Sequence, residues 1–195
     1  MGGGSTPAAH GSPHRNAHLA YRPVDDAFRA REAIADIVER VEADFGLGAL
    51  EPLVQLIDSV NQLESVQTTH TAAFHRAETD PNLLTSLIVM PKTEPGKYAW
   101  WNESEVANSA VAFVKNLEQK FVDPPRGLSV FIGGIEVLMD PAGAKIPGCG
   151  LEFQIEGSGK TSKGALEVWQ WGALALKRYV LSFDSGAAIR TEPHE

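Results

Sequence analysis

The stretch LEFQIE, residues 151–156, alternates apolar and polar side chains without interruption. Because successive side chains of a β-strand point to opposite faces, this period of two predicts a strand with one buried face and one wet face. The preceding run LSVFIGGIEVLM, residues 128–139, is rich in β-branched and apolar residues and predicts a further strand. Together these two runs place a β-sheet in the C-terminal part of the chain.

Two runs downstream show a similar composition: ALEVWQW at 165–171 and LALKRYVLSF at 174–183. Their aromatic and β-branched residues predict two more strands. Short connections favour pairing of successive strands. We therefore expect a four- or five-stranded antiparallel meander within residues 127–185.

Helical periodicity precedes the predicted sheet. An apolar stripe with a period of 3.6 residues predicts an amphipathic helix over 25–45, which ends at Gly46 and Gly48. A second, longer helix is predicted from about residue 50 to the Asp80-Pro81 break, antiparallel to the first. A third is predicted over about 103–121. The apolar run 83–90 between them suits either a short helix or extended chain.

These elements predict an α+β fold: an N-terminal helical hairpin and a third helix, followed by the antiparallel sheet. We expect one domain over residues 23–195, with a helical part at 23–122 and a sheet part at 127–185. Residues 1–22 contain no acidic residue and are rich in Gly, Pro and His, so we expect a disordered tail. This tail is either a targeting segment or a segment that orders on binding. Residues 186–195 are expected to be a flexible C-terminus.

Charge is distributed unevenly. Residues 24–78 contain 11 acidic and 4 basic residues, whereas residues 81–195 are close to neutral. This acidic surplus is either a solvated helix face or a docking surface for a basic partner, and it disfavours nucleic acid as a ligand. The single cysteine, Cys149, favours a reducing compartment. We expect an intracellular protein without a transmembrane segment, in the cytoplasm or in an organelle matrix.

The stretch EGSGKTSKG, residues 156–164, resembles the end of a phosphate-binding loop. The first glycine of that motif would have to stand where the sequence has Gln154, and a strand is predicted where a helix should follow. We therefore expect a hairpin connection over 157–164. Lys160, Thr161 and Lys163 are the candidates for contact with an anion.

Four tryptophans occur in two close pairs, Trp100 with Trp101 and Trp169 with Trp171. Trp169 and Trp171 would share one face of the strand predicted at 165–171. They would there either line a ligand pocket between helices and sheet or pack beneath the helices. A tryptophan of the first pair is a candidate anchor for a partner.

Other polar residues form no recognisable catalytic or metal-binding pattern. His70, His75 and Glu78 are expected to be solvent-facing residues of the second helix, and Cys149 a structural thiol. We predict no catalytic residue, no metal ligand and no cofactor, and we favour a nonenzymatic role.

Three functional hypotheses follow. The first is a noncatalytic protein–protein interaction or assembly subunit of a larger complex. The alternative is a small-molecule-binding or enzymatic domain with an aromatic-lined pocket. The third is anion contact through the 157–164 connection.

Overall fold

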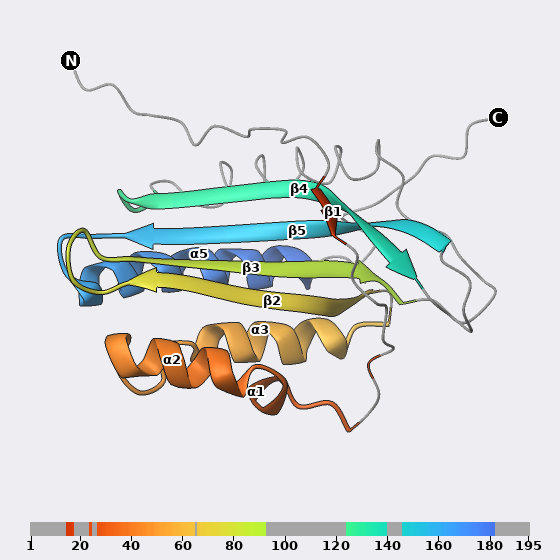
Figure 1. Cartoon of the computed structure of the whole chain (residues 1–195), viewed down its shortest axis with the longest axis horizontal. Helices are drawn as coiled ribbons and strands as arrows, with labels where there is room; N and C mark the ends of the chain where they lie inside the picture. Colours follow the sequence, from red (N-terminus) through yellow and green to blue (C-terminus); the bar gives the residue numbers. More distant parts are fainter. Residues whose placement is uncertain are drawn as a thin grey trace, which may run out of the picture.

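A computed structural model describes residues 15–17, 24, 27–64, 66–92, 124–139 and 146–181. Its centre is one sheet with the strand order β1-β4-β5-β3-β2 (Figure 1). The strands are β1 (Arg15–Ala17), β2 (Val66–Arg76), β3 (Asn82–Pro91), β4 (Leu128–Met139) and β5 (Ile146–Ser158). Neighbouring strands are antiparallel, except that the three-residue β1 runs parallel to β4. The predicted α+β class with an antiparallel sheet is confirmed.

Two hairpins, β2–β3 and β4–β5, make up the main part of the sheet. They join through β3 and β5, where Thr85 lies opposite Ile155, so β5 stands between β3 and β4. The strands predicted at 128–139 and 151–156 are present as β4 and as part of β5. The ambiguous run at 83–90 is strand β3. It carries buried apolar residues on both faces because it lies between β5 and β2 inside the sheet.

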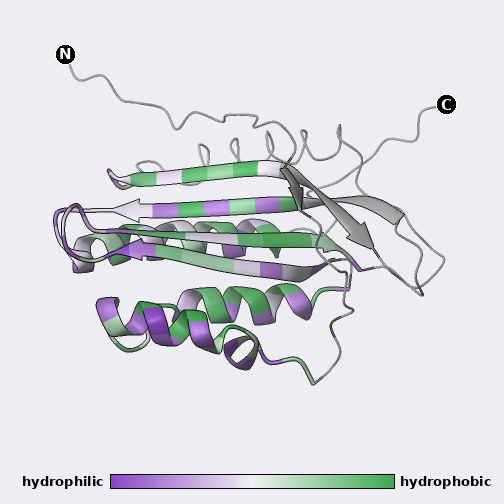
Figure 2. Cartoon of the chain, viewed as in Figure 1, coloured by the Kyte–Doolittle hydropathy of each residue, from purple (hydrophilic) through white to green (hydrophobic). Residues whose placement is uncertain are grey.

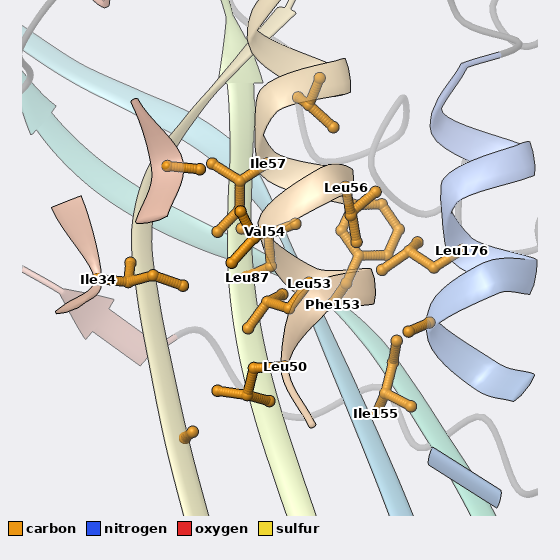
Figure 3. Close-up of a cluster of buried hydrophobic side chains, with 14 of the residues drawn as sticks. Ile34, Leu50, Leu53, Val54, Leu56, Ile57, Leu87, Phe153, Ile155 and Leu176 are labelled. Atoms are coloured by element: carbon orange, nitrogen blue, oxygen red, sulfur yellow. The ribbon is translucent and has the colours of Figure 1, made fainter. Parts of the chain in front are cut away.

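The described helices pack on one face of this sheet. They are α1 (Ala30–Ala33), α2 (Ala35–Phe45), α3 (Glu51–Asn61) and α5 (Ser162–Val180). Helix α5 packs on β5 and β3, and α3 packs against both α5 and β2. Figure 3 shows α3 placing its apolar side chains between strand β3 and helix α5. The core here includes Leu53, Leu56, Leu87, Phe153 and Leu176. Each helix carries its hydrophilic residues away from this core (Figure 2).

The predicted second helix is too long. Helix α3 ends at Asn61, and the run VQTTHTAAFHR forms strand β2 instead. The buried apolar stripe that defines α3 stops at Val60, and four of the six residues from Val66 to Thr71 are β-branched. Such residues lose side-chain freedom in a helix and pack well in a sheet, so this segment forms a strand instead of continuing the helix.

The strands predicted at 165–171 and 174–183 are wrong. Residues Ser162–Val180 form the single helix α5. Its buried side chains recur every three or four residues, as a helix requires, and include Ala165, Trp169, Ala173, Leu176 and Val180. The aromatic content of this segment masked that period in the sequence.

The remaining predicted elements have mixed outcomes. The first helix is broken at Ile34 into the short α1 and the longer α2, and both begin later than residue 25. The third helix, at 103–121, lies outside the described residues. So do most of the predicted tail 1–22 and the C-terminus 186–195.

Candidate interaction surface

Strand β2 forms one edge of the sheet. Within the described ranges it pairs only with β3, so one side of its backbone is not used in the sheet. The Arg40 guanidinium donates a hydrogen bond of 3.4 Å to the carbonyl oxygen of Ala73. Because Arg40 belongs to α2 and not to β3, this carbonyl lies on the free side. In an antiparallel ladder the backbone groups alternate in direction, so those of Thr71 and His75 face the same way.

Helix α2 runs alongside this edge and contacts it through His75. The His75 Nε2 atom lies 2.7 Å from the Asp44 Oδ2 atom. The ring of Phe45 meets the His75 ring edge-on, with centroids 5.8 Å apart. Only 10% of the His75 side chain is exposed, whereas 49% of the Asp44 side chain is. His75 thus anchors α2 and leaves the Asp44 carboxylate accessible.

The face of β2 that points away from the helices carries an exposed aromatic side chain. Phe74 is 64% exposed, although it stands in the regular part of β2, two residues before the strand ends. Its cross-strand neighbour Leu84 and the nearby Ala72 are half-buried. A single exposed apolar side chain is common, but beside the backbone of an edge strand it lies where another chain can pair with the sheet. We define the β2 edge as the backbone of residues 71–75 with Phe74 and Ala72.

A groove lies at the end of β2, where the strand turns toward β3. It has a volume of about 510 Å³ and is lined by Asp44, Arg76, Ala77, Glu78 and Thr79. The groove therefore continues the β2 edge, and its lining includes acidic, basic and polar side chains.

His70 and His75 do not contact each other. His70 and His75 lie on opposite faces of β2, because five residues separate them within a regular part of the strand. Their predicted placement on a helix is wrong. Glu78 is exposed in the turn after β2.

The sheet face on which Phe74 lies, away from the described helices, is polar at its centre, and the polar side chains there are hydrogen-bonded to one another. Glu152 is 8% exposed, and its Oε1 atom accepts hydrogen bonds of 2.8 Å from Ser86 and from Gln154. Asn82 donates similarly to Glu156, at 3.2 Å. These side chains hold one another in place across β3 and β5.

The predicted hairpin connection at 157–164 is wrong. The segment joins β5 to helix α5, so the helix that a phosphate loop requires is present. However, the Thr161 side chain caps that helix itself, by accepting a hydrogen bond of 3.1 Å from the Gly164 backbone. Lys160 is exposed, and Lys163, also exposed, lies 3.8 Å from Glu167 in the next turn.

The glycines of this connection have a packing role. A Cβ atom at Gly157 would lie 2.4 Å from the Ala165 carbonyl oxygen. One at Gly159 would lie 2.6 Å from the Ala165 nitrogen. Helix α5 approaches β5 so closely that only glycine fits at either position.

Trp169 and Trp171 do not form a common surface. Trp169 has no exposed surface and donates a hydrogen bond of 2.9 Å to the Thr85 hydroxyl. A ligand would have to displace core side chains to reach its ring. Trp171 is half-buried, and it does not share a face with Trp169 because residues two apart on a helix point in different directions. Trp100 and Trp101 lie outside the described residues.

Part of the acidic surplus of the helices is neutralised. Arg31 lies 2.5 Å from Glu51 and 3.7 Å from Glu42, which ties α1 to α3 and α2. The hydrogen bond from Arg31 lowers the pKa of the Glu51 carboxyl, and its partner Glu51 raises the pKa of Arg31. Asp36 and Asp44 on α2 have no Arg or Lys partner among the described residues, so they are the acids that remain beside the β2 edge.

Comparisons of the chain with protein-family models, with curated proteins and with solved structures give no match. The described helices do not have the length and apolar character of a membrane span. In the same part of the chain, no three His, Cys, Asp or Glu side chains gather in a way that would hold a metal ion.

Proposed function

We propose that this chain is a noncatalytic protein-interaction subunit that receives an extended segment of another protein along the β2 edge. The observation that carries the proposal is the free side of β2 with the exposed Phe74 beside it. A strand added there would pair with the backbone groups of Thr71, Ala73 and His75 that point away from β3, and it would displace Arg40 from the Ala73 carbonyl oxygen. Its alternate side chains would cover Phe74.

The partner is a protein and not a nucleic acid. The helix beside the edge carries four acidic residues, Asp36, Glu39, Glu42 and Asp44, against the single Arg40. Phosphate backbones require a surplus of positive charge, which this surface does not offer. We place the complex in the cytoplasm, because a chain with one cysteine suits a reducing compartment.

Affinity capture from the native source tests the proposal with a variant that blocks the edge. Thr71→Pro removes an N–H group that points to the free side and leaves the ladder with β3 intact. We expect wild type to capture a stoichiometric partner that Thr71→Pro loses.

Leu174→Ser is the matched control. Leu174 is also an exposed apolar residue, at 48%, but it lies on α5 away from the edge. This variant should retain the partner. Equal capture by wild type and Thr71→Pro, or specific turnover by the purified chain that a point substitution abolishes, would contradict the proposal.

A further inference from the structure

We infer that the chain forms a symmetric dimer through the outer side of β4, so that the sheets of two copies join into one. The occupant of this side is a second copy of the same chain. The inference concerns the side of the sheet opposite the β2 edge and goes beyond the proposed function. It is carried by an uncharged stretch of β4 that β1 leaves uncovered.

The outer side of β4 is covered only at one end. Strand β1 pairs with Ile135, Glu136 and Val137. Among the described residues, no strand pairs with residues 128–134 on that side. This stretch, LSVFIGG, contains neither a charged residue nor a proline, which are two means by which proteins block an edge strand. We define the β4 edge as residues 128–134.

The ladder with β5 fixes the direction of the backbone groups. The Ser158 N–H donates a hydrogen bond of 2.9 Å to the Gly127 carbonyl oxygen, so the groups of Gly127 point to β5. Because backbone groups alternate in direction along an antiparallel strand, those of Val130 and Ile132 point outward. No hydrogen bond among the described residues uses them. The Leu128 N–H also points outward, but it bonds to a carbonyl oxygen of the preceding turn.

One register uses the whole β4 edge without displacing β1. A two-fold axis through Phe131 places Val130 opposite Ile132 of the second copy, and Leu128 opposite its Gly134. Outward backbone groups then meet outward backbone groups, as an antiparallel ladder requires. Moving the axis toward the C-terminal end of β4 brings the second copy onto residues that β1 occupies. Moving it the other way leaves part of the edge unpaired.

This register brings apolar side chains together on both faces of the sheet. Val130 and Ile132 are half-buried and pack against the core beneath the helices. Phe131, also half-buried, lies on the other face beside Gly133, where an added Cβ atom would lie 2.8 Å from its ring. At the axis, Phe131 stands opposite its own copy in a non-hydrogen-bonded pair, with Cα atoms about 4.5 Å apart. Aromatic and β-branched cross-strand pairs of this kind stabilise a sheet.

Helix α5 places an apolar side chain beside the same edge. Leu176 points toward α3 (Figure 3), and α3 lies on the β2 side of α5. Trp171 is five residues earlier and about 140° away around the helix, so it lies on the side nearer β4. Its neighbour Gly172 meets β4 directly, because a Cβ atom there would lie 2.7 Å from the Leu128 Cδ1 atom. Trp171 is half-buried, and further apolar surface beside it is favoured over water.

A second copy fits this edge in length and charge. Seven residues of one copy cover seven of the other, and no like charges meet across the axis because the stretch is uncharged. The strand order β4-β5-β3-β2 then places the β2 edges of the two copies at opposite ends of the joined sheet. The dimer therefore offers two β2 edges, which point away from each other.

Analytical ultracentrifugation of the full chain tests the dimer. Wild type should sediment with twice the mass of one 21.0 kDa chain. Phe131→Lys and Phe131→Glu each set like charges opposite each other at the axis. Each should raise the dissociation constant of the dimer at least about tenfold. An equimolar mixture of the two variants should recover the dimer, because opposite charges then meet across the axis.

Phe74→Lys is the matched control. Phe74 lies on the same face of the sheet but at the other edge, and it is 64% exposed. This variant should dimerise like wild type. Circular dichroism shows whether the Phe131 variants fold. If they do not, NMR of a mixture of isotope-labelled and unlabelled wild type decides, since the register requires a contact between the Phe131 α-protons of two copies, and its absence overturns the inference.

The remaining outcomes are equally direct. A wild type that sediments as a single chain at every concentration overturns the inference. A dimer that both folded Phe131 variants retain does so too, as does a mixture that dimerises no better than either variant alone. The proposed function is tested separately: Thr71→Pro should dimerise like wild type, whatever its effect on capture of the partner.

Discussion

Gly157 sets how closely helix α5 can approach the sheet, and Gly157→Ala should lower stability strongly. A Cβ atom there would lie 2.4 Å from the Ala165 carbonyl oxygen, 2.4 Å from the Trp169 nitrogen and 2.6 Å from the Trp169 Cβ atom. None of these atoms can rotate away. Ordinary contact requires α5 to retreat by about 1 Å, which loosens the packing beneath Trp169. Overpacking of this kind costs about 1–3 kcal/mol, and we expect the upper end because backbone must move.

Urea unfolding and thermal melting followed by circular dichroism measure this loss. For a chain of this size, about 3 kcal/mol corresponds to a fall in Tm of roughly 6–12 °C. Gly164→Ala is the matched control, since its Cβ atom would meet only the Thr161 hydroxyl, at 3.3 Å. Alanine is favoured over glycine in a helix by up to about 1 kcal/mol, so this variant should be as stable as wild type or more so. A Gly157→Ala variant within about 0.5 kcal/mol of wild type, the usual range for harmless surface changes, would refute the close approach of α5.

Three further predictions concern the core, the ion pair and the helix cap. Trp169→Phe and Thr85→Val should each lower the free energy of unfolding by about 1–3 kcal/mol, because each leaves a buried hydrogen-bonding partner unsatisfied. The double variant should lose less than the sum of the two single losses. Urea titrations measure all three variants. Arg31→Ala should raise the pKa of Glu51 toward its ordinary value in an NMR titration. A carboxyl whose pKa is lowered in the folded state stabilises the protein above its ordinary pKa, and this stabilisation is lost as pH falls through the folded pKa. The free energies of unfolding of wild type and variant should therefore converge in acid. An unchanged titration of Glu51 in the variant contradicts this prediction. Thr161→Ala should lower stability by about 1 kcal/mol in the same urea assay, and no change would show that the cap is not formed.

The sequence predicts the elements whose local pattern agrees with their final environment. Alternation in LEFQIE survives in β5 because one face meets the core and the other is polar. The stripe of α3 ends at Val60 because only that part packs on the sheet and α5. Helix α5 is harder to predict, since it lies on the sheet along β5 and buries Trp169 as well as small residues such as Ala173. Its aromatic residues resemble those of a strand, and only the spacing of buried positions distinguishes the two.

The interaction surface depends on contacts between segments distant in sequence, and the sequence alone does not pair them. Arg40 and Asp44 meet Ala73 and His75 from more than thirty residues away. Phe74 is missed from the sequence because the second predicted helix extends through β2. The signal that would have found it is the run of β-branched residues before it, which favours a strand. In that strand Phe74 points away from the helix-facing His75.

The free edge and the acidic helix beside it belong to one arrangement. A regular edge strand with an exposed aromatic residue tends to pair with copies of itself, and proteins usually oppose this with charges on the strand. In β2 the residues from Thr71 to Phe74 carry no acidic or basic side chain, so the strand itself offers no such defence. The nearest charges stand on α2 instead, where Arg40 donates a hydrogen bond to the Ala73 carbonyl oxygen and Asp44 holds the His75 ring. Helix α2 therefore protects part of the edge, and a strand added there would have to displace Arg40 from the Ala73 carbonyl.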